Sequence, residues 1–217
     1  LGATFNFGQL AQAENAPACL SGLPRMKGHD RSFQLRFMEQ LLDIAGAAGH
    51  MDWTCAKKLT QPIFDSYRNV YDVCEGVISG ALTVRSGYDL ILIRRAAFLR
   101  DKDVRIFQVE ENPEDRALMR LFCMGNVTTQ EKALLYEDAW RALEDPVRET
   151  LANALNLDGR RGEPAVQPTY IPALLGRIQD VDALVCTLHY LARVMSATDL
   201  EDPSAVVIER SVYSVLR

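Results

Sequence analysis

The 217-residue sequence has few histidines, no Cys-x-x-Cys pair and no long apolar run. Its longest apolar stretches, residues 90–93 and 96–99, are separated by Arg94 and Arg95. They fall far short of the roughly 20 consecutive apolar residues that a membrane span needs. The chain also lacks a basic segment that leads into an apolar one, as a signal peptide would have. These absences predict a protein without a membrane span.

The cysteines are odd in number and widely spaced, which does not fit a disulfide framework. They are Cys19, Cys55, Cys74, Cys123 and Cys186. Free cysteines are typical of a reducing compartment, so we expect an intracellular protein, cytoplasmic or nuclear. Because the sequence starts without methionine and stops inside an apolar pattern, a fragment of a larger protein is a further expectation.

Motifs for cofactors, metals and activated nucleophiles are missing as well. There is no glycine-rich phosphate loop, no dinucleotide fingerprint and no Gly-x-Ser-x-Gly turn. His29, His50 and His189 lack the spacing of metal ligands. Cys186 and His189 would share a helical face, but core packing explains that spacing with fewer assumptions. We therefore expect no catalytic residue, no cofactor and no metal. A metal-independent enzyme with a site built from non-contiguous residues is the alternative.

What is present is the composition of an ordinary folded protein, with 48% hydrophobic and 24% charged residues. The net charge of −5 is uneven along the chain. Residues 1–108 carry 13 basic and 11 acidic side chains, whereas residues 109–217 carry 11 and 18. Arginine supplies 19 of the 24 basic residues, and its guanidinium suits bidentate contacts with carboxylates.

Apolar residues recur at helical spacing over most of the chain. Capping residues support several of these helices, such as Thr60 before Pro62 and Asn112 before Pro113. The expected helices cover residues 30–45, 60–81, 112–124, 129–143, 146–155, 171–178, 180–195 and 204–216, with a short turn at 52–59. The predicted fold is mainly all-α, an irregular multi-helix bundle or a short helical solenoid.

The domain organisation follows from where helical periodicity is absent. Residues 1–30 contain scattered glycine and proline and predict an extended N-terminal arm. Residues 31–217 are expected to form a single α-helical domain. The segment 158–168 is rich in glycine, proline and charge, and is the one strong candidate for an internal linker.

Residues 88–110 fit two structures. Residues 90–93 are capable of forming a strand and residues 104–110 alternate with period two, so a small β-hairpin through 101–103 is possible. The sequence of residues 94–100 instead favours a helix from 88 to 100, which is the interpretation that we prefer. A two-stranded hairpin alone would be marginal in water.

Five cations gather within twelve residues of the same region. They are Arg94, Arg95, Arg100, Lys102 and Arg105. We expect these side chains to form a contact surface for an acidic partner, which could be a second copy because the second half of the chain is acidic. One alternative is that they pair with carboxylates inside the domain. Another is nucleic-acid binding, which the acidic whole makes less favourable.

The apolar part of the N-terminal arm supplies the remaining candidates. Phe5 and Phe7 provide enough apolar surface to lie along a groove, either of this chain or of a partner. The function with the fewest assumptions is a helical protein–protein interaction module that acts as an adaptor, a scaffold segment or an assembly subunit. Its partner would be another protein or a second copy.

Overall fold

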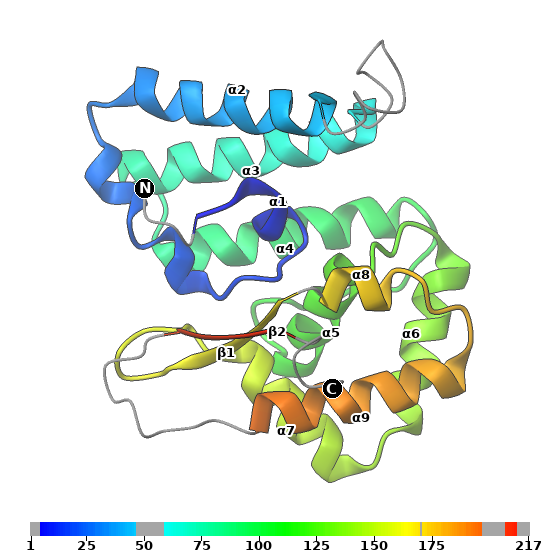
Figure 1. Cartoon of the computed structure of the whole chain (residues 1–217). Coiled ribbons are helices and arrows are strands. Elements are labelled where there is room, and N and C mark those ends of the chain that lie inside the picture. Colours follow the sequence, from blue (N-terminus) through cyan, green and yellow to red (C-terminus); the bar gives the residue numbers. More distant parts are fainter. Residues whose placement is uncertain (1–4, 47–58, 170, 197–206, 212–217) are drawn as a thin grey trace. The chain divides into compact units, whose positions relative to one another are not determined.

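The computed structural model describes residues 5–46, 59–169, 171–196 and 207–211, and it is mainly helical as predicted (Figure 1). The expected short turn at 52–59 lies almost wholly outside these residues. In chain order the elements are α1 (Phe7–Ala11), η1 (Pro17–Leu20), η2 (Leu23–Met26), α2 (Asp30–Gly46), α3 (Gln61–Ser79), α4 (Val84–Arg100), α5 (Pro113–Met124), α6 (Gln130–Ala142), α7 (Asp145–Asn156), β1 (Ala165–Thr169), α8 (Ile171–Leu175), α9 (Val181–Ser196) and β2 (Val207–Ser211).

The chain divides into two compact units, and the boundary between them falls inside α4. Unit 1 comprises Leu1–Ala11 and Leu20–Ile91, and unit 2 comprises Gln12–Cys19 and Leu92–Arg217. The segment expected as an extended arm contributes to both units and forms the short helices α1, η1 and η2. A single domain over residues 31–217, with a linker at 158–168, stays a prediction.

Unit 1 is built around an aromatic cluster. The rings of Phe5 and Phe7 meet edge to face with centroids 5.0 Å apart, and Phe7 also contacts Phe33 and Phe37 of α2. Phe33 stacks on Tyr71 of α3 at 5.1 Å. These contacts hold α2 alongside α3, and the two helices run side by side in Figure 1. Buried aromatic pairs of this geometry stabilise a core beyond their area alone.

Residues 84–100 form the single helix α4, so the alternative of a β-hairpin near 88–110 is wrong. The chain turns tightly after this helix, and Asp103 takes a positive φ of 61°. The backbone N–H of Val104 then donates to the carbonyl oxygen of Leu99 at 3.2 Å. This bond closes the end of the helix, and residues 104–110 that follow do not form a strand.

Helix α5 lies at the centre of unit 2. Its residues from Asp115 to Met124 are all buried, and α6, α7 and α8 pack against it. The helix begins where the sequence predicts, because the Asn112 side chain accepts hydrogen bonds from the backbone N–H groups of Glu114 and Asp115 at 2.9 and 3.2 Å. Helix α9 packs on α6 and α7 and completes this part of unit 2.

The last predicted helix, over residues 204–216, is wrong. Residues 207–211 form strand β2, which pairs in parallel with β1 in a two-stranded sheet. The register places Ala165 opposite Val207 and Thr169 opposite Ser211. The apolar residues at the start of β2 are β-branched, and such side chains favour a strand when a partner strand is present.

Candidate interaction surface

The predicted cations do not share one environment. Arg94 and Arg95 are half-buried on α4, whereas Arg100 and Lys102 are exposed at the end of α4 and in the turn that follows. Arg105 is 44% exposed by side chain but is engaged in ion pairs. The structure therefore separates the five residues into a half-buried pair, an exposed pair and a paired arginine.

Arg105 anchors the loop after α4 to two helices of unit 2. Its Nη2 atom lies 2.7 Å from Asp115 Oδ1, and its Nε atom lies 3.4 Å from Glu137 Oε2. The guanidinium also lies 3.8 Å from the centroid of the Phe107 ring. Partial burial acts to lower the pKa of Arg105, but the two carboxylates outweigh it and raise that pKa. For this residue the structure shows pairing inside the unit.

Exposed apolar side chains lie beside the exposed cations. Phe98 is 41%, Leu134 48% and Ile106 72% exposed. The Lys102 ammonium lies 5.8 Å from the centroid of the Phe98 ring. We call Phe98, Arg100, Lys102, Ile106 and Leu134 the basic–apolar surface.

Helix α6 brings Leu134 next to the loop that carries Ile106. The Gln130 side chain donates to the carbonyl oxygen of Asp103 at 2.9 Å, and Glu137 meets Arg105. Residues three and four apart on a helix share a face, so Leu134 lies on the face of α6 that borders this loop. The sequence singles out the cations but gives no sign of these two exposed aliphatic residues.

The structure places Phe5 and Phe7 away from any surface. Their exposed fractions are 3% and 0%, and both rings pack inside unit 1. Of the two surfaces expected to receive Phe5 and Phe7, a groove of this chain or of a partner, the structure shows packing on this chain. Binding of a partner through these rings would require the aromatic cluster to open.

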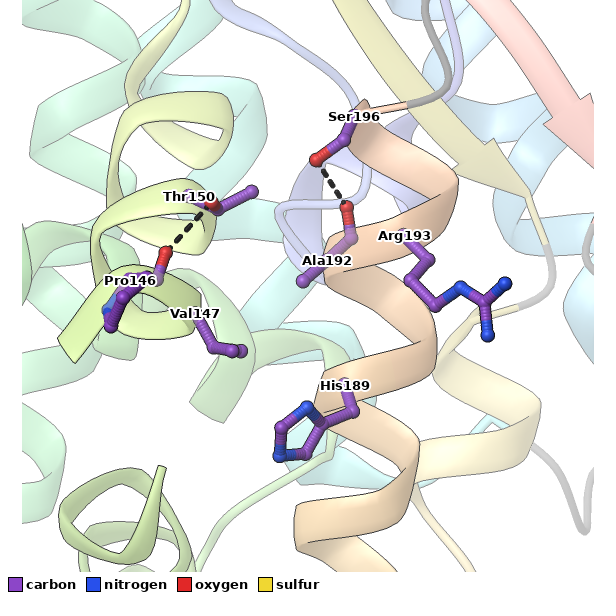
Figure 2. A pocket seen from close by; sticks show the side chains of 7 residues that line it. All are labelled: Pro146, Val147, Thr150, His189, Ala192, Arg193 and Ser196. Atoms are coloured by element: carbon purple, nitrogen blue, oxygen red, sulfur yellow. Dashed lines mark hydrogen bonds between the residues drawn. The ribbon is translucent and has the colours of Figure 1, made fainter. Parts of the chain in front are cut away.

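A shallow pocket of about 490 Å³ lies between α7 and α9 (Figure 2). His189 lines it, and the Nε2 atom of His189 lies 3.2 Å from Glu144 Oε2. The two hydroxyl groups of the lining are committed elsewhere. Thr150 Oγ1 donates to the Pro146 carbonyl and Ser196 Oγ to the Ala192 carbonyl, each at 2.8 Å. Nucleophilic catalysis requires a hydroxyl or thiol beside a base. The lining offers an imidazole, but both of its hydroxyl groups donate to backbone carbonyls.

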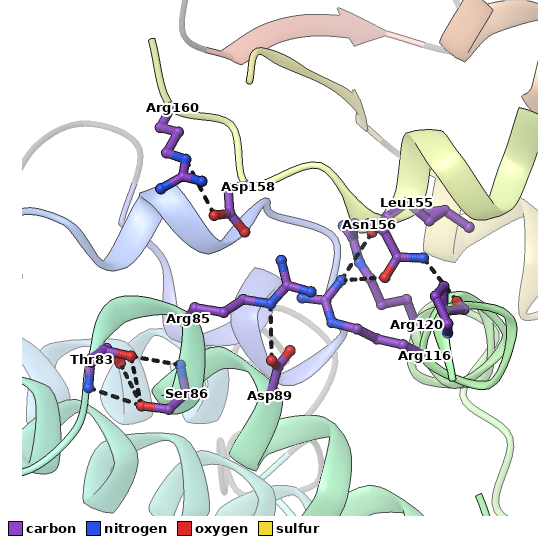
Figure 3. A network of polar contacts seen from close by, with 11 residues as sticks. Thr83, Arg85, Ser86, Asp89, Arg116, Arg120, Leu155, Asn156, Asp158 and Arg160 are labelled. Carbon is purple, nitrogen blue, oxygen red and sulfur yellow. Dashed lines mark hydrogen bonds and ion pairs between the residues drawn. The ribbon is translucent and has the colours of Figure 1, made fainter. Parts of the chain in front are cut away.

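Two buried arginines on α5 were not anticipated from the sequence (Figure 3). Arg120 is 4% exposed, and its Nη2 atom donates to the carbonyl oxygens of Ala13 and Asn15, both at 3.0 Å. Its Nη1 atom donates to the Leu155 carbonyl at the end of α7. Arg116, 2% exposed, donates to the Asn156 side chain at 3.0 Å. These contacts tie residues 12–19 and the end of α7 to the central helix.

Figure 3 also shows a separate set of polar contacts in unit 1. The Thr83 and Ser86 side chains bond to each other's backbone N–H groups at the start of α4. Arg85 Nε lies 2.9 Å from Asp89 Oδ2, one turn apart on the same helix. The Thr83 and Ser86 bonds cap the start of α4. A pair one turn apart, such as Arg85 and Asp89, typically stabilises a helix by roughly a few tenths of a kcal/mol.

Comparison with known proteins gives a family but no activity. A family model matches residues 1–217. The chain belongs to DUF6829, a family of unknown function. No curated protein and no solved structure matches it.

Two further properties of this DUF6829 chain bear on its chemistry. Among the described residues, no group of three or more His, Cys, Asp or Glu side chains is placed to hold a metal ion. None of the described helices is long and apolar enough to cross a membrane. The expectation of a protein without metal or cofactor stays a prediction.

The four described cysteines of this DUF6829 chain fall into three exposure classes, and Cys55 lies outside the described residues. Cys74 and Cys123 are buried, Cys19 is partly exposed and Cys186 is exposed. Burial raises the pKa of the Cys123 thiol, although Arg95 and Arg120 oppose it. Burial likewise raises the pKa of Cys19 to about 12, even though the residue keeps some exposure.

We expect the protein to lose stability as the pH rises above about 8.5. The Cys123 thiol and the Tyr136 phenol both have a raised pKa in the fold because of burial. The unfolded chain therefore releases these protons at lower pH than the fold does, so alkaline conditions favour unfolding. Urea titrations under reducing conditions should give a smaller free energy of unfolding at pH 10 than at pH 7.5. The Cys123→Ala variant should show a weaker dependence, and an unchanged slope would refute this origin.

Proposed function

We propose that the chain is a helical protein–protein interaction module and that its contact site is the basic–apolar surface. The observation that carries this proposal is the exposure of Ile106, at 72%, close to the exposed positive charges of Arg100 and Lys102. Apolar side chains that are exposed together and rimmed by charged residues are typical of a protein interaction surface. Arg105 holds the loop that carries Ile106 in place through its ion pair with Asp115.

The chemistry of this surface specifies the partner. Two exposed cations select carboxylates, and aliphatic side chains select an apolar residue between them. An acidic, amphipathic segment of a protein supports both contacts. Nucleic acid is supported less well, because Phe98 is the single ring among the five residues of this surface, whereas single-strand grooves stack successive bases on several aromatic side chains.

The pocket between α7 and α9 gives the enzyme alternative little support. The imidazole of His189 pairs with Glu144, but the nearby hydroxyls of Thr150 and Ser196 bond to backbone carbonyls of their own helices. General acid–base chemistry would need a substrate group to meet this imidazole in an open, shallow site. We therefore place the function on the surface and not in the pocket.

A synthetic helical peptide tests the proposal directly. The probe carries glutamates on one face and leucines on the other, and a second peptide replaces each glutamate by lysine. We expect only the acidic peptide to bind the full chain by fluorescence anisotropy. The double variant Arg100→Glu and Lys102→Glu should lower that affinity about tenfold or more, since two rim pairs become repulsive. Raising the salt from about 50 to 500 mM should weaken binding severalfold.

The matched control makes the same change in net charge elsewhere in unit 2. Arg177 and Arg193 are exposed and lie outside the basic–apolar surface, so Arg177→Glu with Arg193→Glu should bind the acidic peptide like the wild type. Equal loss in both double variants would mean a general charge effect. Binding of the lysine peptide with similar affinity would overturn the proposal.

A further inference from the structure

Helix α2 carries a second apolar surface, independent of the one just described. Leu35, Met38 and Leu42 are 68%, 57% and 69% exposed. At about 100° per residue they fall within roughly 60° of one another on the helix circumference. They form one stripe, which we call the α2 stripe.

The α2 stripe is not the face that joins α2 to unit 1. Phe33 and Phe37 do that, at 2% and 8% exposed, through their contacts with Tyr71 and Phe7. Both phenylalanines lie about 130° or more around the helix from the middle of the stripe. A solvent-facing helix normally has polar residues opposite its buried face. Here the opposite face is apolar as well, so α2 has the pattern of a helix covered on two sides.

The charges along α2 indicate what covers the stripe. The first half of the helix carries Asp30, Arg31 and Arg36, so its net charge is positive, whereas the second half carries only the acidic Glu39 and Asp43. Arg36 also pairs with Glu39 inside the helix at 2.6 Å. A second α2 laid antiparallel across the stripe brings the basic half of each helix to the acidic half of the other. A parallel arrangement would place like charges together. Antiparallel packing also places the positive end of each helix dipole near the negative end of its neighbour.

We infer that the α2 stripe is a self-association surface, on which α2 of a second copy packs antiparallel. The helix pair would place Leu35 of one copy opposite Leu42 of the other, with the two Met38 side chains at the centre. Arg31 of each copy would approach Asp43 of the other. A helix of 17 residues is about 25 Å long, so the contact is small and the dimer reversible.

Sedimentation velocity of the full chain tests this inference over about 5 to 200 μM. We expect the weight-average mass to rise with concentration from the 24.3 kDa monomer toward twice that value. Met38→Glu should abolish the rise, because it places two carboxylates at the centre of the contact. Leu134→Glu, in unit 2, should leave self-association intact while it weakens binding of the acidic peptide. The two variants thus separate failure of this inference from failure of the proposed function.

A charge swap tests the antiparallel order. Arg31→Glu alone and Asp43→Arg alone should each weaken the homodimer severalfold, whereas an equimolar mixture of the two variants should associate at least as well as the wild type. In the mixed dimer the introduced glutamate of one copy faces the introduced arginine of the other, and the remaining native Asp43 faces the remaining native Arg31. Circular dichroism melts of all variants establish that they are folded. A monomer throughout the concentration range, or a dimer that Met38→Glu leaves unchanged, would overturn the inference.

Discussion

Replacement of Arg120 by methionine is expected to lower the free energy of unfolding by about 4 kcal/mol. Methionine fills similar space but donates no hydrogen bond, so the carbonyl groups of Ala13 and Asn15 lose a buried donor. The Leu155 carbonyl loses its shorter bond and keeps the longer one from Arg116, at 3.4 Å. Each buried acceptor left unpaired costs roughly 1–3 kcal/mol. For a chain of this size the melting temperature should fall by about 10 °C, measured by circular dichroism.

Two comparison variants make the Arg120 prediction specific. Arg120→Lys keeps the charge but loses the planar fork that reaches several carbonyls, so its stability should lie between those of the methionine variant and the wild type. Arg141→Met removes an arginine that is 67% exposed in a surface pair with Asp138, and should change stability by less than about 0.5 kcal/mol. Equal effects at positions 120 and 141 would mean that the buried network does not stabilise unit 2.

Gly125→Ala should be comparably damaging, although it adds a single methyl group. A Cβ atom at this position would lie 1.9 Å from the Tyr136 hydroxyl and 2.5 Å from its Cζ atom. The ring has no room to retreat, because Tyr136 is fully buried, packs edge to face on Phe122 and donates a hydrogen bond to the Leu175 carbonyl at 3.1 Å. We expect a loss of about 3 kcal/mol or more in the free energy of unfolding, by urea titration.

A double-mutant cycle identifies the clash as the cause of that loss. Tyr136→Leu removes the atoms that the new Cβ would meet, so Gly125→Ala should cost much less in that background than in the wild type. Gly162→Ala serves as the control, because no atom lies within 4 Å of its Cβ position. It should leave stability unchanged or slightly raised. Additive effects in the cycle would show that Gly125 matters for another reason.

Helix boundaries that depend on local chemistry were predictable from the sequence. The segment from Asn112 to Gly125 carries a capping side chain, a proline at the first helical position and a glycine at the end, and α5 has these bounds. The structure of residues 88–110 was harder to predict, because residues 90–93 suit a strand as well as a helix. In the structure the backbone N–H of Val104 bonds to the Leu99 carbonyl at the end of α4, and the sequence composition does not indicate such a bond.

Strand β2 shows what local patterns miss. Its apolar residues fit a helix by spacing, but its partner is β1, about 40 residues earlier in the chain. A parallel pair needs a crossover connection, here the segment that contains α8 and α9, and that long-range pairing is not encoded by residues 207–211 alone. The prediction failed because tertiary context outweighed local spacing.

The polar groups of unit 2 were predictable only in part. Apolar residues lie on every side of α5 between and after Arg116 and Arg120, so the sequence leaves this helix no polar face for solvent. That pattern could have predicted that the two arginines are buried. The sequence also pointed to the cations from Arg94 to Arg105 as a group. It could not show that Arg105 is paired, nor that Ile106 stands exposed near Lys102, because both depend on where α6 packs.

We propose that the chain acts through the basic–apolar surface and not through the pocket that His189 lines. Site-specific photo-crosslinking in cells of the protein's own source tests it most directly, with the crosslinker placed at Ile106 or, for comparison, at Val147 in the pocket. We expect adducts from position 106 whose crosslinked peptides, mapped by mass spectrometry, are acidic and contain apolar residues. These adducts should disappear when Arg100 and Lys102 are changed to glutamate. Adducts from position 147 alone, or adducts from position 106 that survive the charge reversal, would contradict the proposed role of the basic–apolar surface.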